Sequence, residues 1–247
     1  MPINIEIKEG YDGMSRRAAK IVAEVINGEE NPVLGLATGE TPIGFYRELV
    51  GMYDDGEVDF SDVTTFNLDE YLGLPQSHPQ SYHRYMEKHL FEKVNIREEN
   101  THIPDGTAEN PAKACKDYER AIEKHGGIDI QLLGIGENGH IGFNEPGSPF
   151  DSRTRVVELA EKTIKDNSRF FESKEKVPRE AISMGIETIM EADRILLLAS
   201  EERKADAVKQ AVEGPVTQDA PASVLQRHPD CRFILDEKSA SKLSLDP

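Results

Sequence analysis

Short runs of apolar, often β-branched residues alternate with longer amphipathic segments along almost the whole chain. Alternation of this kind predicts strands that pair in parallel through right-handed helical crossovers. We therefore expect an α/β fold, a three-layer α/β/α sandwich with a mainly parallel, Rossmann-like sheet. The expected strands are residues 3–7, 33–37, 63–68, 128–134, 195–199 and 233–235, and the expected helices are residues 15–25, from 42 onward, 81–91, 111–125 and 202–213.

The length and composition fit a single catalytic domain over residues 1–247. A chain of 247 residues with 37% apolar and 30% charged residues is typical of a soluble globular protein. No apolar run approaches the roughly 18 residues that span a bilayer. The first residues also lack the basic and apolar regions of a secretory signal. We therefore expect a cytoplasmic protein with no membrane partner.

The charge and cysteine content argue against two further classes of protein. The 29 basic and 46 acidic residues give a net charge of −17, which repels nucleic acid. The two cysteines, Cys115 and Cys231, have no metal-ligand spacing, so we expect buried thiols. The sequence therefore predicts no nucleic-acid partner, no metal and no cofactor.

In parallel α/β sheets ligands bind at the carboxyl ends of the strands, so polar segments that follow strands are candidate site segments. The first contains Thr38, Gly39 and Thr41, followed by Pro42. A strand, a glycine turn and a helix start with Thr41 as its N-cap form an anion site through exposed N–H groups. The alternative is a plain strand–turn–helix junction. Glu40 must also point away from any bound phosphate.

A second segment places two adjacent carboxylates, Asp69 and Glu70, at the end of the predicted strand 63–68. A carboxylate at that edge of the sheet is a candidate general base. The alternative interpretation is an aspartate that caps a turn.

A third segment, residues 134–146, follows a predicted buried strand and is rich in glycine. Glycines let the backbone approach a ligand closely. His140 is the residue in this segment that exchanges a proton near neutral pH, and Glu145 is placed to orient its imidazole and support its cation. A lone histidine is usually structural, but one within such a loop indicates function.

The fourth feature is a pair of cations, Arg169 and Lys204. Lys204 follows the predicted strand 195–199, which would place it near the ligand. Arginine offers bidentate contacts to phosphate and lysine a point charge. The alternative is two ordinary surface cations.

Taken together, these segments resemble the glucosamine-6-phosphate deaminase family, also called the glucosamine/galactosamine-6-phosphate isomerase family, over nearly the whole chain. The most specific motif is Gly-His-Ile-Gly-Phe-Asn-Glu-Pro at residues 139–146, which occurs with Phe-Asn-Leu-Asp-Glu-Tyr at residues 66–71. The resemblance implies the fold shared with ribose-5-phosphate isomerases and CoA transferases. It also implies conversion of glucosamine 6-phosphate and water to fructose 6-phosphate and ammonia, in amino-sugar catabolism.

The resemblance also implies roles for individual residues. Asp69 matches the base of the enolisation step, and His140 matches the residue that assists ring opening. Asn138 and Glu145 match the two positions that support the histidine. Residues 155–177 resemble a mobile lid over the site. The positions that match the phosphate site are Thr38, Gly39, Thr41, Arg169 and Lys204.

Two departures from the family pattern bear on chemistry and regulation. Some members have aspartate at Asn138, so more of the support for an imidazolium falls here on Glu145. Allosteric hexameric members bind N-acetylglucosamine 6-phosphate after the Asn-Glu-Pro motif, where this chain keeps Ser148 and Arg155 but has Glu158. A carboxylate there repels a phosphate. We therefore expect a short, non-allosteric enzyme that is a monomer, with a homo-oligomer as the alternative.

Three other functions compete with this interpretation. A 6-phosphogluconolactonase or a galactosamine-6-phosphate deaminase would share the fold, but a lactonase needs no enolisation base such as Asp69. A non-catalytic sugar-phosphate sensor of a transcription regulator would want an added DNA-binding module and a basic surface. The acidic chain argues against the sensor.

Overall fold

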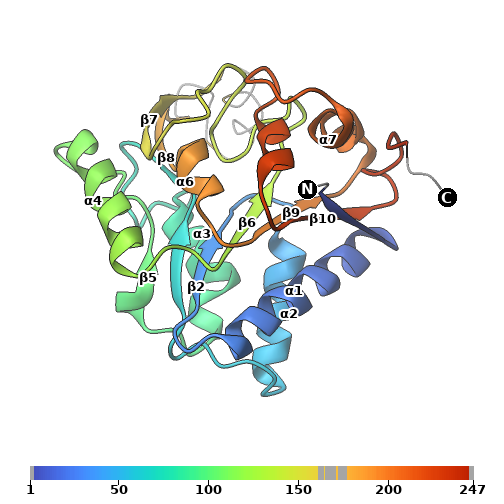
Figure 1. The fold of residues 1–247 in the computed structure, drawn as a ribbon. Coiled ribbons are helices and arrows are strands. Elements are labelled where there is room, and N and C mark those ends of the chain that lie inside the picture. Colours follow the sequence, from blue (N-terminus) through green and yellow to red (C-terminus); the bar gives the residue numbers. More distant parts are fainter. Residues whose placement is uncertain (1–2, 161–163, 165–170, 172–176, 245–247) are drawn as a thin grey trace.

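The computed structural model describes residues 3–160, 164, 171 and 177–244. Its centre is a parallel seven-stranded sheet in the order β1-β10-β9-β6-β2-β3-β5 (Figure 1). The expected mainly parallel sheet with flanking helices is confirmed. The strands are β1 (Asn4–Lys8), β2 (Val33–Leu36), β3 (Thr64–Asn67), β5 (Thr101–His102), β6 (Ile130–Gly134), β9 (Ile195–Ala199) and β10 (Cys231–Asp236).

Helices pack on the sheet through apolar faces. Helix α1 buries Ala18, Val22 and Val25 and packs beside α2 in Figure 1. Phe45 of α2 is fully buried in the main core. The α-helices are α1 (Gly10–Gly28), α2 (Ile43–Asp54), α3 (Tyr82–His89), α4 (Pro111–Lys124), α6 (Ile186–Met190) and α7 (Ala205–Glu213), with 3-10 turns η1 (Phe91–Lys93), η2 (Glu98–Asn100), η5 (Glu202–Lys204) and η6 (Pro221–Arg227).

Side-chain caps fix the starts of two helices near the expected residues. Ser81 Oγ accepts a hydrogen bond from Arg84 N at the start of α3, and Asn110 caps α4 in the same way, just before Pro111. The expected cap at Thr41 is wrong. Pro42 is the residue before α2, and neither it nor Thr41 caps the helix with its side chain.

A second, three-stranded antiparallel sheet was not expected. It has the order β4-β8-β7, from Asp69–Tyr71, Glu180–Ser183 and Arg155–Glu158. The chain changes sheets at Leu68, which donates its N–H to Leu36 O of the main sheet (3.0 Å) and accepts at its carbonyl from Met184 N (2.7 Å). The two carboxylates therefore lie on a strand of their own, and do not end β3.

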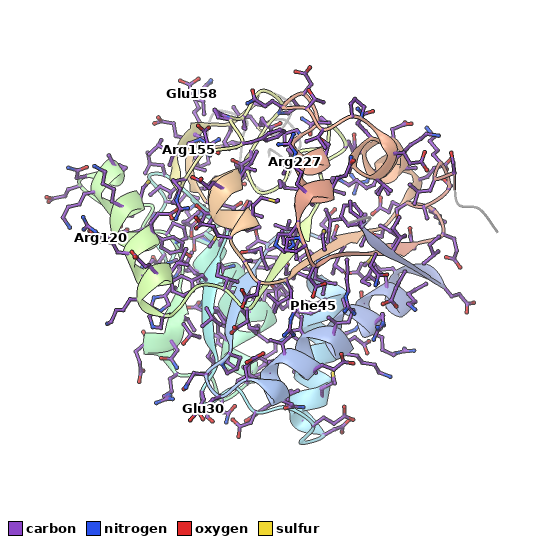
Figure 2. All side chains as sticks on the ribbon, viewed as in Figure 1. Glu30, Phe45, Arg120, Arg155, Glu158 and Arg227 are labelled. Carbon is purple, nitrogen blue, oxygen red and sulfur yellow. The ribbon has the colours of Figure 1, made fainter. Side chains whose placement is uncertain are left out.

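Strand β7 occupies the start of the lid expected at residues 155–177. Arg155 and Glu158, the first and last residues of this strand, are labelled in Figure 2. Most of the remaining segment, including Arg169, lies outside the described residues. Among the described helices, none is both long and apolar enough to cross a membrane.

Candidate active site

A cavity of about 610 Å³ opens where β2, β3 and β6 end. A smaller cavity of about 260 Å³ lies at the opposite ends of β6 and β9, beside Ile130 and Ile195, and contains none of the expected residues. The larger cavity brings together most of the expected site. The expected residues that line it are Thr38, Gly39, Thr41, Asp69, Asn138, His140 and Lys204.

Asp69 is the most deeply buried acid of the cavity wall, with 6% of its surface exposed. Burial raises the pKa of Asp69 to about 8, and the adjacent Glu70 carboxylate adds to the shift. The glycine-rich loop passes close by, because a Cβ added at Gly142 would lie 3.6 Å from Asp69 Oδ2. The site therefore presents a carboxyl that gains and loses a proton near neutral pH.

Glu70 has a different task and faces the start of α3. Its Oε2 accepts from Tyr82 N (2.8 Å) and His83 N (3.3 Å), and its Oε1 accepts from Tyr71 N (2.8 Å). Burial raises the pKa of Glu70 to about 7, and these three bonds oppose the rise because they favour the ionised form. Glu70 thus fixes α3 beside Asp69, a role that the sequence did not indicate.

His140, Asn138 and Glu145 form one connected group. The Asn138 side-chain amide donates to Glu145 Oε2 (2.7 Å), and its Oδ1 accepts from His140 N (3.3 Å). Glu145 Oε2 lies 3.5 Å from His140 Nδ1. Glu145 does not line the cavity itself, so it acts on the site through the imidazole and the amide.

Gly136 leaves the room that the imidazole of His140 occupies. A Cβ added at Gly136 would lie 2.3 Å from His140 Nδ1 and 2.6 Å from its Cγ. The backbone holds the two residues together, because Gly136 N donates to His140 O (2.9 Å). The glycine therefore determines where the imidazole lies.

Arg203 is a cavity residue that the sequence analysis missed. Its guanidinium lies 3.7 Å from Glu40 Oε2 and 3.5 Å from Glu137 Oε1. The acidic side chain of Glu40 therefore has a cation beside it, as an anion site in this loop requires. A signal was present, since Arg203 directly precedes the expected Lys204.

The backbone before this pair of cations is strained. Glu201 has a φ of 76°, a region that non-glycine residues seldom adopt. Its N–H donates to Asp236 Oδ2 (3.1 Å), and its carboxylate lies 2.7 Å from Arg203 Nε. These contacts hold the turn that carries Arg203 and Lys204 to the cavity.

Aromatic side chains that the sequence analysis also missed form another part of the cavity wall. Tyr71 and Tyr82 have ring centroids 5.0 Å apart, and Tyr82 and Phe143 stack with centroids 6.4 Å apart. Phe171 lies edge-on to Tyr71 at 5.9 Å. Rings of this kind offer apolar faces to the carbons of a small polar ligand.

The sheet and the site define an α/β enzyme of the acid–base type, with a carboxyl, a supported imidazole and cations around one polar cavity. The chain belongs to the glucosamine-6-phosphate isomerase/6-phosphogluconolactonase family, whose model matches residues 8–233. The resemblance drawn from residues 66–71 and 139–146 is thereby confirmed.

Curated relatives match over almost their entire length. Glucosamine-6-phosphate deaminase 2 of Bacillus subtilis is 55% identical over 243 residues, covering 98% of each chain. Glucosamine-6-phosphate deaminase of Thermoanaerobacter pseudethanolicus is 53% identical over 239 residues, covering 97% of this chain and 94% of the relative.

One solved structure gives the same family, and another gives the same fold. A monomeric glucosamine-6-phosphate deaminase superposes with a TM-score of 0.95 at 44% identity, covering 97% of this chain and 99% of the other. A 6-phosphogluconolactonase from Trypanosoma cruzi superposes with a TM-score of 0.78 at 21% identity, covering 99% of each chain. The second similarity shows a shared fold alone.

Proposed function

We propose that this chain converts glucosamine 6-phosphate and water to fructose 6-phosphate and ammonia. The observation that carries the proposal is Asp69, a buried carboxyl on the cavity wall whose pKa is raised to about 8. Moving a proton between two sugar carbons needs a base of this strength at neutral pH. Relatives at 53% and 55% identity that carry the name of this activity support the same reaction.

The first chemical step is the opening of the sugar ring. One proton leaves the C1 hydroxyl and one reaches the ring oxygen. His140 takes the first and delivers the second, and Glu145 at 3.5 Å from its Nδ1 stabilises the imidazolium between the two transfers. Asn138 donates to Glu145 and accepts from the backbone N–H of His140, so it keeps the two side chains aligned.

The second step uses Asp69. Its carboxylate takes the C2 proton of the open-chain aldehyde and returns it to C1, while a second proton passes from the C2 amino group to the C1 oxygen. This leaves CH2OH at C1 and an imine at C2. Water adds to that carbon, ammonia departs, and the C2 carbonyl of fructose 6-phosphate forms. Every atom of the products comes from the sugar phosphate and one water.

The phosphate of the substrate binds to the loop after β2. Thr38, Gly39 and Thr41 lie on the cavity wall. Lys204 lines the same cavity and follows β9, which is two strands away from β2 in the sheet. Arg203 offsets the charge of Glu40 in this loop. Arg169 remains a predicted phosphate ligand outside the described residues.

We further propose a cytoplasmic monomer without allosteric activation, since sugar phosphates are made and retained inside cells. The solved relative with a TM-score of 0.95 is described as monomeric. Arg155 donates to Asn144 Oδ1 (2.8 Å) and Ser148 Oγ (3.3 Å), so its guanidinium is engaged within the fold. Light scattering at the mass of one chain, 27.6 kDa, together with hyperbolic kinetics with and without N-acetylglucosamine 6-phosphate, would support this proposal.

The test of the reaction is ammonia release from glucosamine 6-phosphate, followed with glutamate dehydrogenase. Galactosamine 6-phosphate and 6-phosphogluconolactone serve as rival substrates in parallel assays. We expect ammonia from the glucosamine compound and no hydrolysis of the lactone. Lactone hydrolysis without ammonia release would overturn the proposal.

A further inference from the structure

Tyrosine hydroxyls hold the carbonyl groups of the loop between β2 and α2. Tyr85, from α3, donates its hydroxyl proton to Gly39 O (2.6 Å). Tyr46, from α2, donates to Ala37 O (2.6 Å) from a fully buried position in the core. Two helices thus hold alternate carbonyls of the same short loop.

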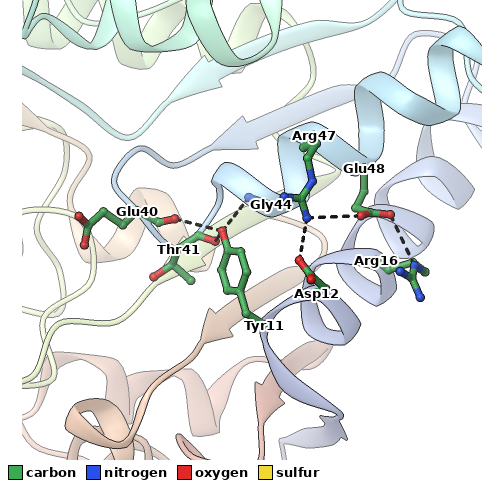
Figure 3. A network of polar contacts seen from close by, with 8 residues as sticks. All are labelled: Tyr11, Asp12, Arg16, Glu40, Thr41, Gly44, Arg47 and Glu48. Atoms are coloured by element: carbon green, nitrogen blue, oxygen red, sulfur yellow. Dashed lines mark hydrogen bonds and ion pairs between the residues drawn. The ribbon is translucent and has the colours of Figure 1, made fainter.

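Tyr11, from α1, holds the other end of the loop. Its hydroxyl lies 2.9 Å from Thr41 O and 3.2 Å from Glu40 O, which share its proton (Figure 3). The same oxygen accepts from Gly44 N (2.7 Å) in the first turn of α2. The ring fits because residue 44 has no side chain: a Cβ there would lie 2.7 Å from the Tyr11 ring.

These bonds decide which way the peptide groups of the loop face. A peptide is planar, so its carbonyl and the following N–H point to opposite sides of the chain. A phosphate is bound by N–H groups and repelled by carbonyl oxygens. A loop that binds phosphate through its backbone must therefore keep its carbonyls turned away from the anion.

Gly39 makes the loop prone to the wrong orientation. Its φ of 97° lies where only glycine rests without strain, and a glycine backbone rotates easily to other conformations. Rotation of the peptide after Gly39 would break the bond of its carbonyl to Tyr85 and reverse the N–H of Glu40. The Tyr85 bond thus favours one of the two orientations that the backbone at Gly39 would allow. The bond from Tyr11 to Glu40 O orients the next peptide, whereas the Thr41 carbonyl is followed by Pro42, whose nitrogen carries no hydrogen.

We propose that Tyr85 and Tyr11 are positioning residues that hold the loop of residues 37–41 in the peptide orientation that binds the substrate's phosphate. This inference rests on the proposed function, which assigns the phosphate to that loop. The two rings are half-buried, and the Tyr85 ring packs against His89 at 4.5 Å and Tyr46 at 6.3 Å. Phenylalanine would keep this packing and lose the hydroxyl.

The test compares Tyr85→Phe and Tyr11→Phe with wild type in steady-state kinetics and in titration with inorganic phosphate. A net hydrogen bond of about 1 kcal/mol corresponds to about a fivefold change in the ratio of the binding orientation to the other one. We expect KM for glucosamine 6-phosphate and Kd for inorganic phosphate to rise together by the same factor, up to about fivefold. The value of kcat stays close to wild type, because the contact is made equally in the ground and transition states.

Tyr53→Phe is the matched control. Tyr53 is half-buried on α2, its ring lies 6.3 Å from that of Phe60, and none of the contacts among described residues engages its hydroxyl. KM, Kd and kcat of this variant should equal those of wild type. Melting temperatures of all four proteins show whether a change in KM reflects the loop or the fold.

Three outcomes separate the inference from the proposed function. A rise in KM and phosphate Kd at constant kcat supports the inference. Unchanged KM and Kd in both variants, or a loss of kcat that follows a loss of melting temperature, overturns it. If wild type itself neither binds inorganic phosphate nor releases ammonia, the proposed function fails, and the inference fails with it.

Discussion

Asp69 and Glu70 are neighbours on β4, yet their carboxyl groups serve different parts of the molecule. Successive side chains of a strand point to opposite faces. Asp69 lines the cavity, and Glu70 accepts the N–H groups at the start of α3. The charge of Glu70 contributes to the raised pKa of Asp69. One short strand thus places the proposed base, adjusts its acidity and fixes the helix beside it.

The raised pKa of Asp69 predicts a pH dependence of activity and of stability with opposite signs. Only the ionised carboxylate takes a proton from C2, so kcat/KM should rise with pH through about 8.

Because the folded-state pKa of Asp69 lies above the unfolded one, the folded state is favoured at low pH and loses that advantage as the pH rises through about 8. Asp69→Asn should therefore melt at a higher temperature than wild type at pH 9, with a smaller difference at pH 4. Calorimetry at both pH values measures this difference. If Asp69→Asn melted at a lower temperature than wild type at pH 9, the raised pKa of Asp69 would be contradicted.

Gly136→Ala should displace the imidazole of His140, since the added Cβ would lie 2.3 Å from its ring. The ring moves more easily than the backbone, so we expect the fold to survive. Loss of a positioned acid–base group typically costs about a hundredfold or more in rate, so kcat should fall by about that factor. Gly51→Ala, on α2 where an added Cβ meets nothing within 4 Å, is the control. Equal kcat values for the two variants would show that the His140 position is unimportant.

Glu145→Gln removes the carboxylate that lies 3.5 Å from His140 Nδ1 while keeping an oxygen for the Asn138 amide. We expect kcat to fall by about ten- to a hundredfold, because the imidazolium loses its charged partner while its position is kept. The assay is ammonia release at saturating substrate. Glu123→Gln makes the same chemical change near the end of α4 and is the control, for which we expect the wild-type kcat. A variant as active as wild type would remove Glu145 from the mechanism.

The sequence predicted the main sheet well and the second sheet poorly, for reasons that lie in particular residues. Residues 195–199 are continuously apolar and form β9 with the same bounds. Strand β4 is only Asp-Glu-Tyr. A segment of three residues is too short to show the alternation of apolar and polar side chains that predicts a strand. Its pairing with β8 joins segments more than a hundred residues apart.

The residues of the candidate site were likewise predicted in part and missed in part. Residues in distinctive motifs, such as Asp69 and His140, were found because their types and neighbours are informative. Arg203 and Tyr85 were missed because their partners, Glu40 and Gly39, are distant in sequence and meet them only in the fold.

Arg203→Gln should weaken substrate binding more than catalysis. The change removes the cation that lies 3.7 Å from Glu40 and 3.5 Å from Glu137, so the negative potential that an entering phosphate meets becomes stronger. We expect KM to rise by about three- to tenfold at low salt with little change in kcat, and the effect to shrink at high salt through screening. Arg194→Gln, which breaks the exposed pair with Glu29 at 3.4 Å and lies at the smaller cavity, outside the proposed active site, should leave KM unchanged. A KM effect that does not respond to salt would contradict this electrostatic account.

The most direct test of the central claim is ammonia release from glucosamine 6-phosphate by wild type and by Asp69→Asn, measured side by side. Asparagine preserves the size of the side chain but cannot take a proton from C2. We predict robust ammonia release by wild type and a loss of about a thousandfold or more in the variant, as removal of an essential base requires. An Asp69→Asn enzyme that releases ammonia at the wild-type rate would contradict the account.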